Sequence, residues 1–267
     1  MQRITIFILC WLGLASPSFA SDNKVIVTLP PLSGLVTLLL PEIKSHCLLP
    51  AGADPHHFQL SPRQTDMFNQ ASLFIRASHD DQGWAMPQPR KATMDMWSKQ
   101  SHAWLNFAQV QQILPQLSHT LGITFPQYQS LLEQRLAQAQ AIVAKMQQQW
   151  ETSLEPLKNK GTIMQHAAWQ GLMLAQNIPV WTVLESAQHG HEHGPQHLEQ
   201  ALNTLNQHPQ SLLLGSKRHS NRSLSWLASH HPSKSNSAII ELDALGQCNQ
   251  PWQNLMQENL RRLTAVL

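Results

Sequence analysis

Histidine is the outlying residue type of this chain. The 267 residues include 15 histidines, almost as many as the 16 aspartates and glutamates together. His56 and His166 follow segments that we expect to be β-strands, and Asp243 follows a third. Ligands of open α/β sheets bind outside the carboxyl ends of the strands, and imidazoles with a carboxylate make a tetrahedral zinc site. We therefore expect these three residues to face one cleft as metal ligands, although a lone histidine at a strand end is more often a satisfied polar residue.

The loop Gly52–Phe58 (GADPHHF) adds local support for a ligand at this position. Pro55 fixes its own φ and restricts the residue before it. The loop is therefore stiff, and less entropy is lost when a histidine is aimed at an ion. Spacing alone leaves open whether His56 or His57 faces inward.

A second group of histidines lies in residues 188–197 (QHGHEHGPQH). Short histidine-rich tracts bind metals through flexible arrangements. The segment is either an auxiliary collecting loop near the cleft or a solvated polar loop with incidental histidines. Its histidines are His189, His191, His193 and His197. We expect the following as surface or capping residues: His46, His79, His119, His208, His219, His230 and His231.

Short apolar segments alternate with helical ones in both halves of the chain. The β-branched run Lys24–Leu29 (KVIVTL) ends at two prolines, which indicates a buried strand. Further strands are expected at 43–49, 73–77, 162–165, 180–184, 211–214 and 238–242, and helices at 32–40, 61–69 and 167–176. This alternation is typical of α/β lobes with mainly parallel sheets.

Residues 127–153 differ in character from both halves. From Tyr128 to Trp150 there is no glycine or proline, and apolar residues recur at three-to-four spacing. The pattern predicts one long amphipathic helix, which we interpret as a spine between two lobes rather than a coiled-coil arm. The expected fold is α/β, with lobes at 21–126 and 155–267, a rigid helix at 127–154, and a metal site in the interlobe cleft.

The first 20 residues have the features of an export signal. Arg3 is followed by the apolar run Ile4–Ala15, and the small residues Ser18 and Ala20 form a cleavage site. The run is shorter than the roughly 20 residues that span a bilayer. Since Ser21 rather than a cysteine follows, we expect a periplasmic protein without a lipid anchor. The alternative is a buried N-terminal strand or helix.

Charge and cysteine content argue against a nucleic-acid-binding protein and against a thiolate zinc site. The formal net charge is +2 and charged residues make up 13% of the chain, so no basic patch indicates a nucleic-acid partner. Cys47 and Cys248 remain after removal of the signal. An oxidising compartment permits a disulfide between them, but a pair this distant can equally stay as two buried thiols. Because no Cys-x-x-Cys occurs, a thiolate zinc site is not expected.

Four segments resemble those of the zinc- and manganese-binding periplasmic proteins of ABC importers, which have a rigid linking helix. Gly52–Phe58 is similar to the Gly-x-x-Pro-His-x-Tyr/Phe segment of that family. Ser101–Asn106 (SHAWLN), Gln165–Trp169 (QHAAW) and Glu241–Gly246 (ELDALG) resemble its later segments in the same order. The acidic, histidine-rich loop of many zinc members is absent between the first two segments, and their Gly-x-x-x-Glu-x-Trp is represented only by residues 78–84 (SHDDQGW).

Carried over position by position, the resemblance implies His56, His102 and His166 as metal ligands, with either Asp243 or water as the fourth. It selects His56 over His57, and it adds His102, which the strand-end argument does not find. Three imidazoles resemble the zinc-selective branch, because the manganese branch has a carboxylate at the position of His166. Nitrogen ligands suit zinc, whereas oxygen-rich sites suit manganese.

The resemblance implies a zinc-binding protein that delivers Zn²⁺, as a transported ligand rather than a cofactor, to an ABC-transporter permease in the inner membrane. We expect a monomer without enzyme activity. The alternatives are a protein for manganese or another divalent metal, a metal chaperone or adhesion protein, and a zinc hydrolase. The sequence has no His-Glu-x-x-His helix and no obvious general base for a hydrolase. Because the ligands must be deprotonated, affinity is expected to fall as pH drops through the imidazole range near about 6.5.

Overall fold

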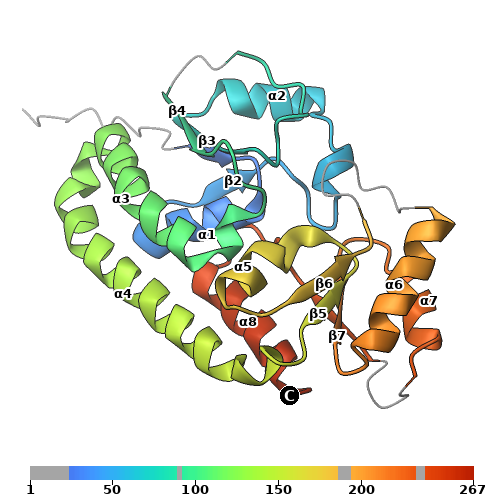
Figure 1. The fold of residues 1–267 in the computed structure, drawn as a ribbon. Helices are drawn as coiled ribbons and strands as arrows, with labels where there is room; N and C mark the ends of the chain where they lie inside the picture. The colour runs from blue at the N-terminus through green and yellow to red at the C-terminus, as the bar shows by residue number, and fades with distance from the viewer. Residues whose placement is uncertain (1–23, 89–91, 186–193, 233–237) are drawn as a thin grey trace, which may run out of the picture.

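The computed structural model describes residues 24–88, 92–185, 194–232 and 238–267. Within these ranges the chain forms two four-stranded parallel sheets, with strand orders β2-β1-β3-β4 and β6-β5-β7-β8 (Figure 1). The predicted architecture of two α/β lobes joined by a long helix is confirmed. The expected signal segment lies outside the described residues. No helix in the described part of the chain is long and apolar enough to cross a membrane.

The first sheet forms where its sequence is β-branched and fully buried. Val25, Ile26 and Val27 of β1 are completely inaccessible to solvent. Proline in the first turn begins α1, and a capping box of Ser61 and Gln64 begins α2. The elements are β1 Val25–Val27, α1 Pro30–Leu39, β2 Ser45–Cys47, α2 Pro62–Asn69, β3 Leu73–Ser78 and β4 Ala92–Trp97. The strand β4 was not predicted from the sequence.

Two helices form a hairpin along one side of both lobes (Figure 1). The predicted long helix is α4, Gln129–Ser153, with 25 residues. It packs against α3, Phe107–Thr124, which sequence analysis missed. Asn106 caps α3 by accepting from two backbone N–H groups, and Pro115 lies inside the helix. The linking helix is therefore braced by a second helix rather than standing alone.

The second lobe has the same α/β organisation as the first, with a four-stranded parallel sheet. Its strands lie where they were predicted, with bounds shifted by a residue or two. The helices α6, α7 and α8 were not predicted. The elements are β5 Thr162–Met164, α5 Gln170–Ala175, β6 Val180–Val183, α6 Pro195–Gln207, β7 Leu212–Ser216, α7 Arg222–Ser229, β8 Ile239–Leu242 and α8 Trp252–Thr264.

One apolar core joins the two lobes. It includes the fully buried rings of Trp104, Trp150 and Trp252, from the first lobe, α4 and α8. Trp252 donates its indole N–H to the carbonyl oxygen of Trp104, and Trp104 donates to the carbonyl oxygen of Ala244, both across 2.7 Å. The C-terminal helix α8 packs on α1 and α4, so the end of the chain ties the lobes together.

A disulfide reinforces this connection. Cys47, at the end of β2, is bonded to Cys248, which lies just before α8. Nearby, a Cβ on Gly34 of α1 would come within 2.6 Å of the carbonyl oxygen of Gln250. Glycine is therefore required where α1 approaches this loop. Of the two states that the sequence left open for these cysteines, the structure has the bridge.

Candidate metal centre

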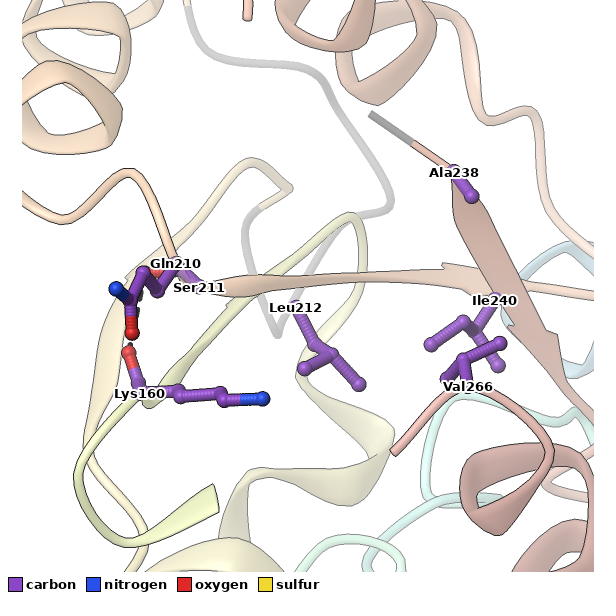
Figure 2. Close-up of a pocket in the computed structure, with 7 residues that line it drawn as sticks. All are labelled: Lys160, Gln210, Ser211, Leu212, Ala238, Ile240 and Val266. Atoms are coloured by element: carbon purple, nitrogen blue, oxygen red, sulfur yellow. Dashed lines mark hydrogen bonds between the residues drawn. The ribbon is translucent and has the colours of Figure 1, made fainter. Parts of the chain in front are cut away.

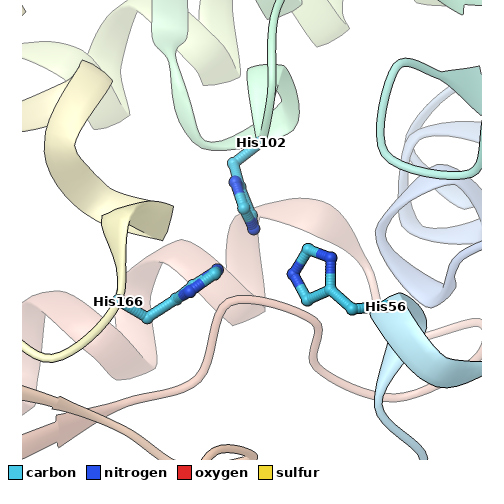
Figure 3. Close-up of side chains that lie close together, drawn as sticks. All are labelled: His56, His102 and His166. Carbon is cyan, nitrogen blue, oxygen red and sulfur yellow. The ribbon is translucent and has the colours of Figure 1, made fainter. Parts of the chain in front are cut away.

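Three imidazole rings converge between the lobes (Figure 3). His56 lies in a 3-10 turn after β2, His102 follows β4, and His166 follows β5. One potential ligand atom from each ring lies within 4.8 Å of those of the other two. The ring centroid of His166 is 5.3 Å from that of His56 and 5.2 Å from that of His102. The structure thus brings together all three histidines selected from the sequence.

The backbone around His56 is held at both ends. Asp54 accepts from the backbone N–H of His56 across 2.9 Å. The indole N–H of Trp84 donates to the carbonyl oxygen of Pro55 across 2.8 Å. The next histidine, His57, is exposed. The structure therefore places His56, and not its neighbour, in the cluster.

His102 is placed by an unusual backbone conformation. Its φ is 52°, in the left-handed region, which a non-glycine residue occupies only at a cost. Its backbone N–H donates to both oxygens of Asp80, at 3.0 and 3.2 Å. Ser101 Oγ donates to Asp80 Oδ1 and also lies 2.7 Å from His102 Nδ1. Burial raises the pKa of Asp80, whose hydrogen bonds from Ser101 and His102 act in the opposite direction.

A carboxylate also lies behind His166. Glu185 Oε2 is 3.4 Å from His166 Nδ1, and both side chains are almost fully buried. Gln165 donates to the other oxygen of Glu185 across 2.8 Å, and accepts from the backbone N–H of Leu224. A carboxylate in this position fixes the tautomer and ring orientation of a metal-binding histidine. Glu185 directly follows the predicted strand 180–184, yet sequence analysis did not single it out.

Several buried polar atoms of the cluster have no hydrogen-bond partner. They are Nε2 of His56, both ring nitrogens of His166, and Oε2 of Glu185. Unpaired buried polar groups are destabilising. A divalent cation would supply a partner for imidazole lone pairs at the centre of the cluster, so the donor set fits a metal ion.

The surroundings of His56 and His102 favour the neutral form of both rings. Burial, with a smaller contribution from His166, lowers the pKa of His56 to about 4. The same causes hold the pKa of His102 well below its usual value. Neutral imidazole carries the lone pair that binds a metal. Proton competition at these two residues therefore begins below the window near about 6.5 that the sequence alone suggests.

The structure does not bring Asp243 into this group. Its Oδ1 accepts from the backbone N–H groups of Leu245 and Gly246, at 3.0 and 2.9 Å. Lys217 and Arg218 each place a nitrogen 3.4 Å from the carboxylate. Burial raises its pKa, but the Gly246 and Leu245 N–H groups and the two cations outweigh this, so the pKa is lowered. In the described part of the chain, Asp243 belongs to no set of metal-ligating atoms within 4.8 Å.

His219 was expected at the surface, and this expectation is wrong. Its ring stacks on that of His166, with centroids 4.5 Å apart, and lies 5.7 Å from that of His56. Burial, followed by the nearby His166, lowers its pKa. The sequence position of His219 could have indicated this, because His219 lies shortly after β7, and β7 pairs with β5, the strand that precedes His166. His231 is buried as well, contrary to expectation.

The predicted collecting segment is only partly described. His189, His191 and His193 lie outside the described residues. His197 lies in the first turns of α6, and its Nε2 is 3.1 Å from the carbonyl oxygen of Val183.

A cavity at the amino ends of β7 and β8 is not lined by metal-binding side chains of the described residues. It has a volume of about 330 Å³ and is bordered by Lys160 and the starts of β7 and β8 (Figure 2). Among the described residues, its lining contains no histidine, cysteine, aspartate or glutamate. The chemistry of a metal site is therefore found at the interlobe cluster.

Solved structures of periplasmic metal-binding proteins share this fold. A ZnuA crystal structure has 18% identity and a TM-score of 0.77, covering 91% of this chain and 98% of that chain. A variant of an Mn-bound periplasmic metal-binding protein from Candidatus Liberibacter asiaticus has 13% identity and a TM-score of 0.77, covering 92% and 100%. FpvC from P. aeruginosa with Ni²⁺ has 13% identity and a TM-score of 0.76, covering 91% and 96%.

The family follows from the sequence match. No curated protein matches the chain. The model of the family described as zinc-uptake complex component A, periplasmic (ZnuA), matches residues 25–266, nearly the whole described chain. The family resemblance noted in the sequence is thereby confirmed. The chain belongs to the ZnuA family of periplasmic metal-binding proteins.

Proposed function

We propose that this protein captures a zinc ion at His56, His102 and His166 and delivers it to an ABC-type importer. The observation that carries the proposal is the convergence of three largely buried imidazoles, with ligand atoms within 4.8 Å. Two of these rings have buried nitrogens without a hydrogen-bond partner. Three protein nitrogens leave one position of a tetrahedral zinc ion for water or another donor.

The donor set favours zinc over manganese. Manganese prefers carboxylate and water oxygens, whereas imidazole suits zinc, copper and nickel. Asp80 accepts from Ser101 and Glu185 Oε1 accepts from Gln165, and neither carboxylate belongs to the three-histidine set. The alternative cargo is another divalent ion, since structures of this fold include Mn-bound and Ni²⁺-bound proteins.

Capture without catalysis accounts for the arrangement better than hydrolysis does. A zinc hydrolase needs a general base beside the metal-bound water. Glu185, the carboxylate nearest to His166, faces its Nδ1 and accepts from Gln165. Asp54, near His56, accepts from the backbone N–H of that residue. We therefore propose a non-enzymatic, monomeric protein that works in the periplasm with a permease of the inner membrane. The metal chaperone and adhesion alternatives differ only in lacking that permease.

A chelator-competition titration of the metal-free protein tests the capture step. We expect tight one-to-one zinc binding, weaker manganese binding, and loss of tight zinc binding in His56→Ala, His102→Ala and His166→Ala. His57→Ala is the matched control, because His57 is in the same loop but exposed. Manganese binding tighter than zinc binding would assign the protein to the alternative cargo.

Delivery needs a separate test. A bacterial strain that lacks its own periplasmic zinc-binding component should regain growth in zinc-limited medium when it carries this protein. The His166→Ala variant should not restore growth, whereas His57→Ala should. Tight zinc binding in vitro without restored growth would favour the chaperone alternative.

A further inference from the structure

The residues His219 and Asp54 extend the metal centre toward solvent. Ligand atoms of Asp54, His56 and His219 lie within 4.8 Å of one another, so His56 belongs to this set as well as to the three-histidine set. We call Asp54, His56 and His219 the outer set, and His56, His102 and His166 the inner set. Asp54 Oδ2 is 4.0 Å from His219 Nδ1, while its Oδ1 accepts from the backbone of His56.

Burial increases from the outer set to the inner set. The side chain of Asp54 is 31% exposed and that of His219 is 11% exposed. The inner residues His102 and His166 are 9% and 1% exposed. An ion that arrives from solvent therefore meets the carboxylate of Asp54 before it reaches His166. Opposite charge at the mouth of a site raises the local concentration of a cation and its association rate.

The shared residue decides how the two sets relate to each other. A neutral imidazole has one ring nitrogen with a lone pair, while the other carries a proton. His56 can therefore serve one ion at a time. The two sets are alternative positions of one ion rather than two sites that fill together.

Resting on the proposed function, we infer that the outer set is an entry station, at which the ion is first bound and from which His56 passes it to His102 and His166. His219 also lies within ligand reach of His166 and Glu185, so it borders both positions. An intermediate station changes the barrier between the solvent and the inner set. It accelerates binding and release by the same factor and leaves the equilibrium affinity unaltered.

Stopped-flow mixing of metal-free protein with zinc chloride, read out by a competing fluorescent chelator, tests the inference. In His219→Ala and His219→Phe, association and dissociation rates should both fall roughly tenfold, with Kd within roughly twofold of the wild type. The phenylalanine variant keeps a ring against His166 but has no ligand nitrogen. Asp54→Asn should slow association as well while retaining the capping oxygen. His57→Ala is again the control.

The outcomes separate the station from other roles. Wild-type rates in His219→Phe would overturn the inference, because the ring would then act only by packing. Faster dissociation with a weaker Kd would also overturn it, since His219 would be a ligand in the final state. Simultaneous binding of two tight zinc ions by the wild type would contradict the sharing of His56. If instead the wild type binds no zinc tightly, the proposed function itself fails.

A second experiment isolates the station. His102→Ala removes an inner ligand and leaves the outer set complete, so weak and rapid zinc binding should remain. Addition of His219→Phe to this variant should abolish the residual binding. Persistence of the weak binding in the double variant would contradict an outer station.

Discussion

Trp84 donates its indole N–H to the carbonyl oxygen of Pro55 across 2.8 Å, and its ring packs on Phe58 at 4.4 Å between centroids. The two contacts flank His56 and tie its loop to the segment after β3. A histidine held by its backbone in this way loses little entropy when it binds an ion, because the loop is already ordered. We therefore expect the zinc affinity of the centre to depend on Trp84, which is not one of the candidate ligands.

Replacement of this tryptophan tests that dependence. Trp84→Phe should retain most of the ring packing but leave the Pro55 carbonyl without its donor. A lost hydrogen bond of about 1 kcal/mol corresponds to about a fivefold increase in the Kd for zinc. Chelator competition measures the change, with Trp226→Phe on α7 as the control. An unchanged Kd would show that the loop is fixed by other contacts.

Glu185, the carboxylate next to His166, is expected to affect the Kd for zinc more than Trp84 does. Glu185→Gln removes the negative charge 3.4 Å from His166 Nδ1 but keeps an oxygen for Gln165. Loss of such a partner typically weakens metal binding by roughly 10–100-fold. The same competition titration provides the value, and a thermal melt checks that the variant is folded. The control is Glu155→Gln, which neutralises an exposed carboxylate. Equal affinities of Glu185→Gln and the control would refute a tuning role.

Acid should destabilise the metal-free protein. The pKa of His56 is about 4 in the folded state, lowered by burial from its ordinary 6.5. Between these values the unfolded chain binds a proton that the folded chain does not, so the free energy of unfolding rises with pH. The contribution of neutral His56 to stability is therefore fully present above its ordinary pKa of 6.5. It is lost as the pH falls toward its folded-state pKa of about 4. His102 acts in the same direction.

Urea unfolding of metal-free protein at about pH 7, 6 and 5 measures this slope. In His56→Gln the decline between the first and last points should be shallower than in the wild type. His119→Gln, which alters an exposed histidine on α3, should keep the wild-type slope. Identical slopes in all three proteins would contradict the burial of a neutral His56.

The disulfide is expected to stabilise the fold with little effect on the metal centre. Cys47→Ser with Cys248→Ser should lower the free energy of unfolding by about 2–5 kcal/mol, because the cross-link closes a long loop of the unfolded chain. Since neither cysteine belongs to the inner or outer set, the Kd for zinc at neutral pH should change by less than roughly threefold. Denaturant titration and chelator competition give the two values. A large loss of affinity would mean that the bridge positions the lobes around the ion.

The sequence predicted the fold well where local patterns are strong. The β-branched run Lys24–Leu29 before two prolines predicted β1, and the absence of glycine and proline predicted α4. Other elements depend on tertiary contacts. Strand β4 is exposed at three of its six positions, which weakens its local strand pattern. Helix α3 contains Pro115, which locally opposes a helix. Their packing partners, β3 and α4, lie elsewhere in the chain and decide their structure.

The site was predictable to the extent that it follows strand ends. That rule found His56 and His166, and it would have found Glu185, which directly follows a predicted strand. It also selected Asp243, because spacing cannot show that Arg218 and the Gly246 N–H occupy that carboxylate. His102 came only from the family resemblance, since its position depends on a left-handed backbone conformation.

Anomalous X-ray diffraction from crystals of the protein loaded with one equivalent of zinc tests the central claim most directly. The account predicts a single strong peak at the zinc edge, about 2.0–2.1 Å from one ring nitrogen of each of His56, His102 and His166. A peak bound only by histidines of residues 189–197, or no ordered peak at all, would contradict it.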